Sequence, residues 1–307
     1  MFVFITRRLL SLLPVTLGVL TIVALLIHVV PGDPADAILG PYATAADKAQ
    51  LHASLGLDKP FLVQLLEYIK GVIGGDLGTS LIYTKPVTTL IADRWLPTAQ
   101  LAVLALIVAM LVSLPLGIIS AVKAGRPLDY AAMALAMTGI AIPNFWLGPM
   151  MVLLFSLNLG WLPVSERSGP SSYVLPALTL GIALAAILSR MTRNSMLDHL
   201  REDYARTARA KGVSESSVVL KHVLRNAALP LITVVGLQFG VLLTGAIITE
   251  RIFDWPGLGT LILDGINNRD YPLVQGCVLV FSCTYLLVNL LTDLTYAIVD
   301  PRIQVGD

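Results

Sequence analysis

The residue types that most often do chemistry are few in this sequence and far apart. Gly257-Leu258-Gly259 lacks the third glycine of a dinucleotide loop, and no G-x-x-x-x-G-K-[ST] phosphate loop or G-x-S-x-G serine elbow occurs. The histidines form no H-E-x-x-H motif or other metal-ligand cluster; they are His28, His52, His199 and His222. We therefore predict that the chain is not an enzyme, holds no metal and does not itself bind nucleotide.

The elements around these residues are dominated by apolar sequence. Hydrophobic residues make up 56% of the chain and charged residues 13%, a balance that excludes an ordinary soluble globule. Six stretches carry no charge, and the shortest has 22 residues, enough for a helix of about 33 Å across a hydrocarbon core of about 30 Å. They are residues 9–32, 95–122, 130–165, 168–189, 226–249 and 271–292. Because only helices satisfy their own backbone groups in lipid, we predict an all-α polytopic membrane protein with six transmembrane helices.

The third stretch is unusually long for one span. Two spans would need about 40 residues and a turn, so residues 130–165 are interpreted as one long helix, bent at Pro143 and ending near residues 160–163.

The positive charges set the predicted orientation. Arg7 and Arg8 precede the first apolar stretch, and Lys123 and Arg126 separate the second from the third. The segment between the fourth and fifth holds a further cluster of basic residues: Arg193, Arg201, Arg206, Arg209, Lys211, Lys221 and Arg225. These segments fall on one side, which the positive-inside rule makes cytoplasmic. Both termini are then inside, and residues 31–94 and 251–270 are outside.

The cytoplasmic segment between the fourth and fifth stretches is the most distinctive. Residues 202–212, EDYARTARAKG, lack proline and are rich in alanine and arginine, so they are predicted to be helical. Gly212 is predicted to end this helix with φ > 0, and Ser214 is placed to cap the next one. From charge alone, a solvated basic helix or one lying on anionic lipid explains the segment as well as a surface that docks a partner.

Motifs along nearly the whole chain give a further indication. They are Arg7-Arg8-Leu9-Leu10, Pro31-Gly32-Asp33-Pro34, Gly75-Asp76-Leu77-Gly78, Pro143-Asn144-Phe145-Trp146, Trp255-Pro256-Gly257-Leu258-Gly259, Arg269-Asp270-Tyr271-Pro272 and Asp300-Pro301-Arg302. In this order the sequence resembles the permease family of ABC importers for dipeptides, oligopeptides, glutathione and nickel, and residues 202–212 look like the coupling loop of such permeases.

The resemblance implies a type I ABC importer permease in the bacterial inner membrane, without a cofactor of its own. It implies a second, homologous but non-identical permease subunit, two cytoplasmic ATPases that bind ATP and Mg, and an extracytoplasmic solute-binding protein; nucleic acid is not an expected partner. The ATPase-coupling residues would be Glu202, Tyr204, Ala205, Arg206, Thr207, Ala208, Arg209 and Gly212. Arg206-Thr207-Ala208 replaces the Glu-Ala-Ala of the broad importer signature, a substitution that favours the peptide branch.

Polar residues inside the apolar stretches are candidates for the solute path, because they are costly in lipid and tend to face a cavity. They are Asn144, Gln238, Thr244 and Asn289. Each also fits a hydrogen bond to a neighbouring helix. In the family's setting the loop with Trp255, Pro256, Gly257 and Gly259, followed by a short amphipathic helix over residues 260–266, would be an outer gate or a lid.

The predicted organisation has four parts. Residues 1–30 form an N-terminal segment and the first span, residues 31–94 a small extracytoplasmic helical cap, residues 95–300 the permease core with the coupling loop 193–229, and residues 301–307 a cytoplasmic tail. The expected function is import of di- or oligopeptides or glutathione by alternating access. The alternatives are a permease for nickel or another small solute, and, in a different class, an ATP-independent secondary transporter or channel.

Overall fold

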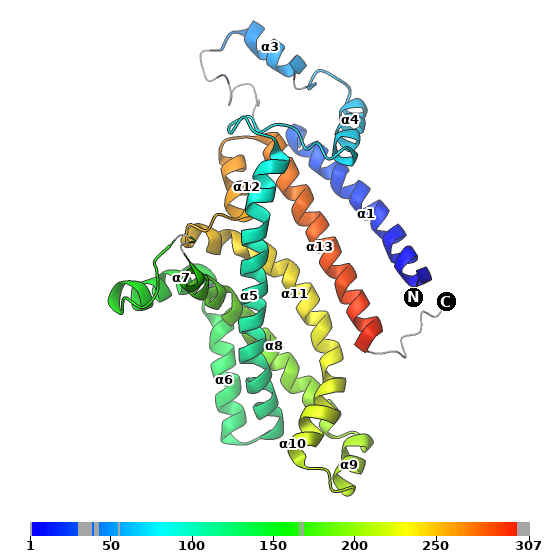
Figure 1. The fold of residues 1–307 in the computed structure, drawn as a ribbon, viewed down its shortest axis with the longest axis vertical. Helices are drawn as coiled ribbons and strands as arrows, with labels where there is room; N and C mark the ends of the chain where they lie inside the picture. Colours follow the sequence, from blue (N-terminus) through cyan, green and yellow to red (C-terminus); the bar gives the residue numbers. More distant parts are fainter. Residues whose placement is uncertain are drawn as a thin grey trace. The chain divides into compact units, whose positions relative to one another are not determined.

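The computed structural model describes residues 2–29, 39, 43–54, 56–165, 167 and 169–299, and its elements are helices (Figure 1). The chain divides into two compact units. One comprises Met1–Thr98 and Pro256–Leu287, and the other comprises Ala99–Trp255 and Val288–Asp307. Helices α5 (Val87–Val122) and α13 (Tyr271–Val299) contribute to both units.

The first unit holds the N-terminal helices and the segment predicted as a cap. Its other helices are α1 (Phe2–Val29), α3 (Ala45–Ser54), α4 (Phe61–Ile73) and α12 (Leu258–Asn267). α4 begins directly after Pro60 and packs on α1, and the apolar residues of 61–73 recur at the spacing typical of a helix with one apolar face. Leu62, Leu66 and Ile73 on α4 remain exposed in this chain. The short helix predicted after Trp255 is also present, as α12.

A buried carboxylate fixes the segment that precedes α5. Asp270, which is fully buried, accepts hydrogen bonds from Ser80 Oγ at 2.5 Å and from the backbone N–H of Ile82 at 3.3 Å. The N–H of Val87 donates to the carbonyl of Gly78 at 3.0 Å. α5 therefore starts at Val87, eight residues before the charge-free stretch that begins at residue 95. A membrane helix can continue into polar surroundings in this way, because its charged residues there reach water.

The second unit is built around α8 (Val174–Leu200), which packs on α6 (Pro127–Ala141), α7 (Asn144–Met151) and α11 (Leu224–Ile252). Two glycines permit this packing. A Cβ at Gly181 would lie 2.8 Å from the carbonyl oxygen of Ala105 on α5, and a Cβ at Gly139 on α6 would lie 2.8 Å from that of Ile182. Small residues let helix backbones approach closely, and this is the usual way membrane helices pack.

The third apolar stretch is not one long helix, and that prediction was wrong. α6 ends at Ala141, α7 begins at Asn144, and the two parts are bent by 99°. The break does lie at Pro143, as predicted. Proline removes a backbone donor and restricts the residue before it to extended conformations, and Ile142 is extended, with ψ 116°. A π-helical segment, Val152–Asn158, continues α7.

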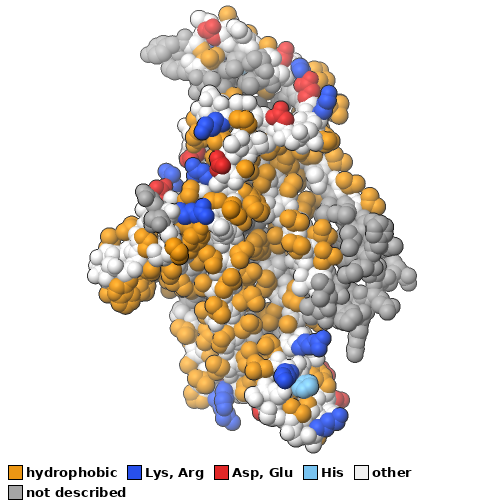
Figure 2. Space-filling model, in the orientation of Figure 1, with side chains coloured by type: hydrophobic (Ala, Val, Ile, Leu, Met, Phe, Trp, Pro, Cys, Tyr) orange, Lys and Arg blue, Asp and Glu red, His pale blue; other side chains and the backbone are white. Residues whose placement is uncertain are grey.

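The surface has the composition of a membrane protein. Among the described residues, four helical segments are long and apolar enough to cross a bilayer, or five if the bent pair counts as one span. The four are Val87–Val122, Pro170–Leu200, Glu215–Gly240 and Tyr271–Thr295. The apolar stretch Leu13–Leu25 within α1 is shorter and is not counted among them. Apolar side chains cover much of the face drawn in Figure 2. An all-α polytopic membrane protein is therefore confirmed.

One buried ion pair joins three helices of the second unit. Arg193 on α8 donates from Nε and Nη2 to the two carboxylate oxygens of Asp129 on α6, both at 2.8 Å. Asp129 is buried, and it also accepts from Ser120 Oγ on α5 and, at 2.9 Å, from the N–H of Gly125. Two-point contacts of this kind fix orientation as well as distance. The pair therefore holds the ends of α5, α6 and α8 that lie nearest the α5–α6 turn.

Candidate functional site

The segment between α8 and α11 folds as an amphipathic helix, a glycine turn and a second helix. These are α9 (Asp203–Ala210), Gly212, and α10 (Glu215–Ser217), which runs through the π-helical segment Val218–Val223 into α11. The predicted helix–glycine–helix element is confirmed. Figure 1 shows α9 beside α10 at one end of α11.

α9 is attached to the membrane helices by its alanines. Ala205 and Ala208 are buried, and their positions three residues apart put them on the same face of α9. They pack in a cluster with Met196 of α8, Ala121 of α5, and Val218, Val219, Val223 and Ala227 at the start of the next helix. Any larger side chain at these two positions would push α9 away from the helices below it. α9 is thus in direct packing contact with α5, α8 and the start of α11.

The turn after α9 has a fully hydrogen-bonded C-cap. Gly212 has φ +77° and donates its N–H to the carbonyl of Arg209 at 2.9 Å, and the N–H of Val213 donates to the carbonyl of Ala208 at 3.2 Å. These two bonds form a Schellman motif, in which the C′ residue must adopt a left-handed conformation that favours glycine. Ser214 occupies the N-cap of α10, but its side chain makes no capping hydrogen bond.

Arg209 holds this element together through its hydrogen bonds. Its Nε and Nη2 donate to the two oxygens of Glu215 at 2.9 and 2.8 Å, and its Nη1 donates to the carbonyl of Leu200 at 3.2 Å. The hydrogen bonds with Glu215 raise the pKa of Arg209. Arg209 therefore joins the ends of α8, α9 and α10. Sequence reasoning missed Glu215, although an acid three residues beyond the glycine turn was a visible signal.

The outer face of α9 is charged and open. Its exposed residues are Glu202, Asp203, Arg206, Thr207, Ala210 and Lys211. The nearest ion pair on this face is Arg206 with Asp203, at 3.5 Å, and both side chains are more than 70% exposed. Such a pair contributes little and leaves both charges accessible to a partner. Figure 2 shows Lys and Arg side chains at the end of the second unit that carries α9.

Tyr204 lies between the two faces. Its ring packs against the alanine cluster and lies 6.4 Å from the ring of His199, centroid to centroid. Within the described part of the chain, neither the Tyr204 hydroxyl nor His199 Nδ1, both buried, has a hydrogen-bond partner. Tyr204 thus contributes apolar packing to the anchor of α9.

Two of the four predicted path residues come together. Asn144, at the start of α7, and Gln238 on α11 line one cavity of about 170 Å³, whose other walls come from α6, α8 and α11. They are 94 positions apart in the sequence, so only the fold brings them together. Asn289 is half-buried on α13 and does not line this cavity. Thr244 lies outside the residues whose side chains the structure describes.

The residues predicted as an outer gate are firmly packed. In the second unit, Trp255 is 1% exposed and its ring meets the Tyr173 ring edge-on, with centroids 4.7 Å apart. In the first unit, Pro256 is half-buried, Gly257 and Gly259 are buried, and the N–H of Gly257 donates to Thr260 Oγ1 at 3.2 Å to cap α12.

The fold is shared with solved ABC importers. The chain superposes on an inward-facing structure of the MetNI methionine ABC transporter with a TM-score of 0.58, at 17% sequence identity, over 69% of this chain and 96% of that one. An amino acid ABC transporter crystallised with histidines gives a TM-score of 0.53 at 15% identity, over 68% and 93% of the two chains. The fold is thus that of the membrane-spanning subunits of ABC importers.

Sequence comparison identifies the family. Residues 113–305 match the binding-protein-dependent transport system inner membrane component, and residues 1–102 match the N-terminal component of the same systems. The glutathione transport system permease protein GsiC of Salmonella typhi is 48% identical over 98% of both chains, and that of Escherichia coli K12 is 45% identical over the same share. The chain therefore belongs to the family of binding-protein-dependent transport system inner membrane components. It is a multi-pass permease subunit of the inner membrane, and catalysis is not its role.

Proposed function

We propose that this chain is one of two non-identical permease subunits of an ATP-driven importer, and that the solute is glutathione or another short peptide. The solute class is supported by the 48% identity to glutathione permeases over 98% of both chains. Two ATPase subunits, which bind ATP and Mg, and an extracytoplasmic binding protein complete the complex. This chain carries no cofactor.

The proposed topology has six spans with both termini in the cytoplasm. The spans are α1, α5, the bent pair α6–α7, α8, the continuous helix from α10 through α11, and α13. The positive-inside rule supports this orientation, because it puts Lys123, Arg126 and the basic segment around α9 on the same side. Residues 31–94, with α3 and α4, then form the extracytoplasmic cap.

The observation that carries the proposal is the anchoring of α9. Its charged outer face is exposed, whereas Ala205 and Ala208 fix its inner face to α5, α8 and the start of α11. A helix built in this way can receive a push on one face and move the membrane helices with the other. Arg206 is the basic residue placed to meet acidic residues of an ATPase, since Arg209 is already bound to Glu215.

The transport cycle follows from this connection. When the two ATPases close on ATP, they pull the α9 elements of the two permeases together, and the bundles open to the outside. The solute then passes from the binding protein to the cavity between the permeases, and ATP hydrolysis resets the complex. Asn144 and Gln238 are the polar groups of this chain proposed to line the path.

A reconstitution experiment tests the proposal. The complete complex is placed in liposomes with ATP inside, and the binding protein is added outside with labelled glutathione. Uptake that needs both the binding protein and hydrolysable ATP is expected. Accumulation of glutathione without ATP, driven by an ion gradient, would contradict the proposal. Substituting nickel and dipeptides as labelled solutes in the same vesicles tests the solute class.

A further inference from the structure

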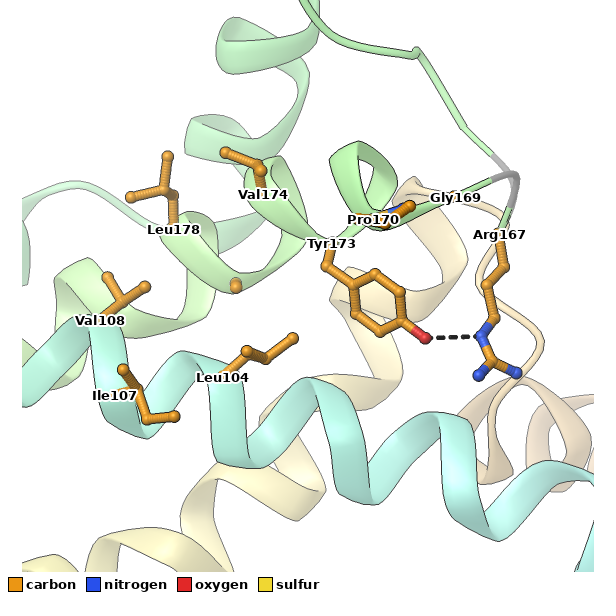
Figure 3. A pocket seen from close by; sticks show the side chains of 10 residues that line it. Leu104, Ile107, Val108, Arg167, Gly169, Pro170, Tyr173, Val174 and Leu178 are labelled. Atoms are coloured by element: carbon orange, nitrogen blue, oxygen red, sulfur yellow. Dashed lines mark hydrogen bonds between the residues drawn. The ribbon is translucent and has the colours of Figure 1, made fainter.

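A basic side chain stands at the rim of an apolar cavity in the second unit. The cavity has a volume of about 750 Å³ and is lined by α5, by the segment before α8, and by the first turns of α8. This volume lies within the roughly 300–1,000 Å³ that is usual for small-molecule sites. Figure 3 shows Leu104, Ile107, Val108 and Val174 around the cavity and Arg167 at its edge.

Neutral groups hold the Arg167 guanidinium in place. Its Nε donates to the Tyr173 hydroxyl at 2.7 Å, the contact drawn in Figure 3, and its Nη2 donates to Gln100 Oε1 at 2.8 Å. The Tyr173 hydroxyl itself donates to Gln100 Oε1 at 3.0 Å. Tyr173 is in turn packed against the buried ring of Trp255. Tyr173 and Gln100 thus orient the guanidinium of Arg167.

The positive charge of Arg167 is not neutralised by any residue that the structure describes. Among the described residues, no carboxylate lies within salt-bridge distance of Arg167. A guanidinium has five N–H donors, and the hydrogen bonds to Tyr173 and Gln100 use two of them. The donors that remain, on Nη1 and Nη2, form the planar edge that binds a carboxylate through two parallel hydrogen bonds. Arg193 shows the contrast, because its positive charge is paired with the Asp129 carboxylate.

We infer that Arg167, oriented by Tyr173 and Gln100, binds a carboxylate of the transported solute at the rim of this cavity. The inference rests on the proposed function, because glutathione and other peptides carry a free carboxylate. The cavity wall beside Arg167 is apolar, and an apolar neighbour strengthens a charged hydrogen bond. The site gives the permease its own preference for anionic solutes, separate from that of the binding protein.

The test compares two substitutions at Arg167 with a matched control. Arg167→Met removes the charge and keeps a long side chain, Arg167→Lys keeps the charge without the two-point contact, and Arg251→Met removes another exposed arginine of the same unit. The complete complex with each variant is reconstituted in phosphatidylcholine vesicles, with and without added phosphatidylglycerol. Glutathione uptake and the ATP hydrolysis stimulated by the binding protein are measured together.

We expect Arg167→Met to lower glutathione uptake about tenfold or more, the loss of a hydrogen-bonded charge contact, while stimulated ATP hydrolysis stays within about twofold. Arg167→Lys should retain an intermediate rate, and Arg251→Met the rate of the unmodified complex. Equal uptake by Arg167→Met and the unmodified complex would overturn the inference. So would a loss that appears only with phosphatidylglycerol, since Arg167 would then bind lipid phosphate, and so would a parallel loss of ATP hydrolysis. If the unmodified complex takes up no glutathione, the proposed function fails and this inference fails with it.

Discussion

The glycine turn between α9 and α10 allows a demanding test of how movement reaches the membrane helices. Gly212 has φ +77°, and a Cβ added there would meet no heavy atom within 4 Å. A substitution therefore acts through the backbone alone, without a steric clash. For a residue with a Cβ the left-handed conformation costs roughly 1–2 kcal/mol, and β-branched residues are the least tolerant of it.

Replacing Gly212 with valine should weaken this turn. A cost of about 1–2 kcal/mol changes the population of the native turn by a factor of roughly 5–30. Without the turn, the Schellman bonds from Gly212 and Val213 are lost and the contact between Arg209 and Glu215 is loosened. α9 would then move without carrying the membrane helices with it. We expect Gly212→Val to lower the number of solute molecules transported per ATP hydrolysed.

The assay measures uptake and ATP hydrolysis on the same proteoliposomes, with the amount of assembled complex as reference. Gly212→Asn is the matched control, because asparagine adopts the left-handed conformation far more readily than valine. The asparagine variant should transport with nearly the coupling ratio of the unmodified complex. An unchanged ratio in Gly212→Val, or an equal loss in both variants, would refute the reasoning.

Three further substitutions test the packing of the second unit, each by thermal unfolding of the purified complex. Arg193→Met should destabilise the protein by about 3–5 kcal/mol, because it leaves the buried Asp129 carboxylate without its partner. Adding Asp129→Leu in the same chain should restore part of this loss. An unchanged melting temperature in Arg193→Met would contradict this expectation. Gly181→Ala should lower the stability by about 1–3 kcal/mol, since its Cβ would lie 2.8 Å from a backbone oxygen. Gly18→Ala is the control and should have no such cost, because a Cβ there meets nothing within 4 Å. Equal effects of the two substitutions would argue against close helix packing at Gly181. Tyr204→Phe should leave the ratio of solute transported to ATP hydrolysed unchanged and the stability equal or higher, because the buried hydroxyl has no partner among the described residues. A loss of coupling in this variant would show that the hydroxyl bonds a partner subunit.

The sequence predicts the local elements of this fold well. Apolar spacing predicts α4, alanine and arginine content predicts α9, and the glycine after α9 predicts the left-handed turn that Gly212 makes. Pro143 likewise predicts where the third apolar stretch breaks. These features depend on a few neighbouring residues, and their physical causes act within one or two turns of chain.

The remaining features depend on contacts across the fold. Pro143 permits a break, but the 99° angle is set by the packing of α6 and α7 on α8, with Gly139 against Ile182 as one close approach. Arg167 escaped notice because its partner Gln100 is 67 positions away and nothing in the sequence links them. The pairing of Asn144 with Gln238 in one cavity was hidden for the same reason.

The role of this chain in an ATP-driven importer is tested by purifying the tagged chain from its native membrane in mild detergent. The co-purifying proteins are then identified, and ATP hydrolysis is assayed. A second permease and two ATPase subunits should co-purify, and the binding protein should stimulate ATP hydrolysis. This stimulation should fall when the exposed face of α9 is altered by Arg206→Glu. A chain that purifies alone and transports solute in liposomes without ATP would not be a subunit of an ATP-driven importer.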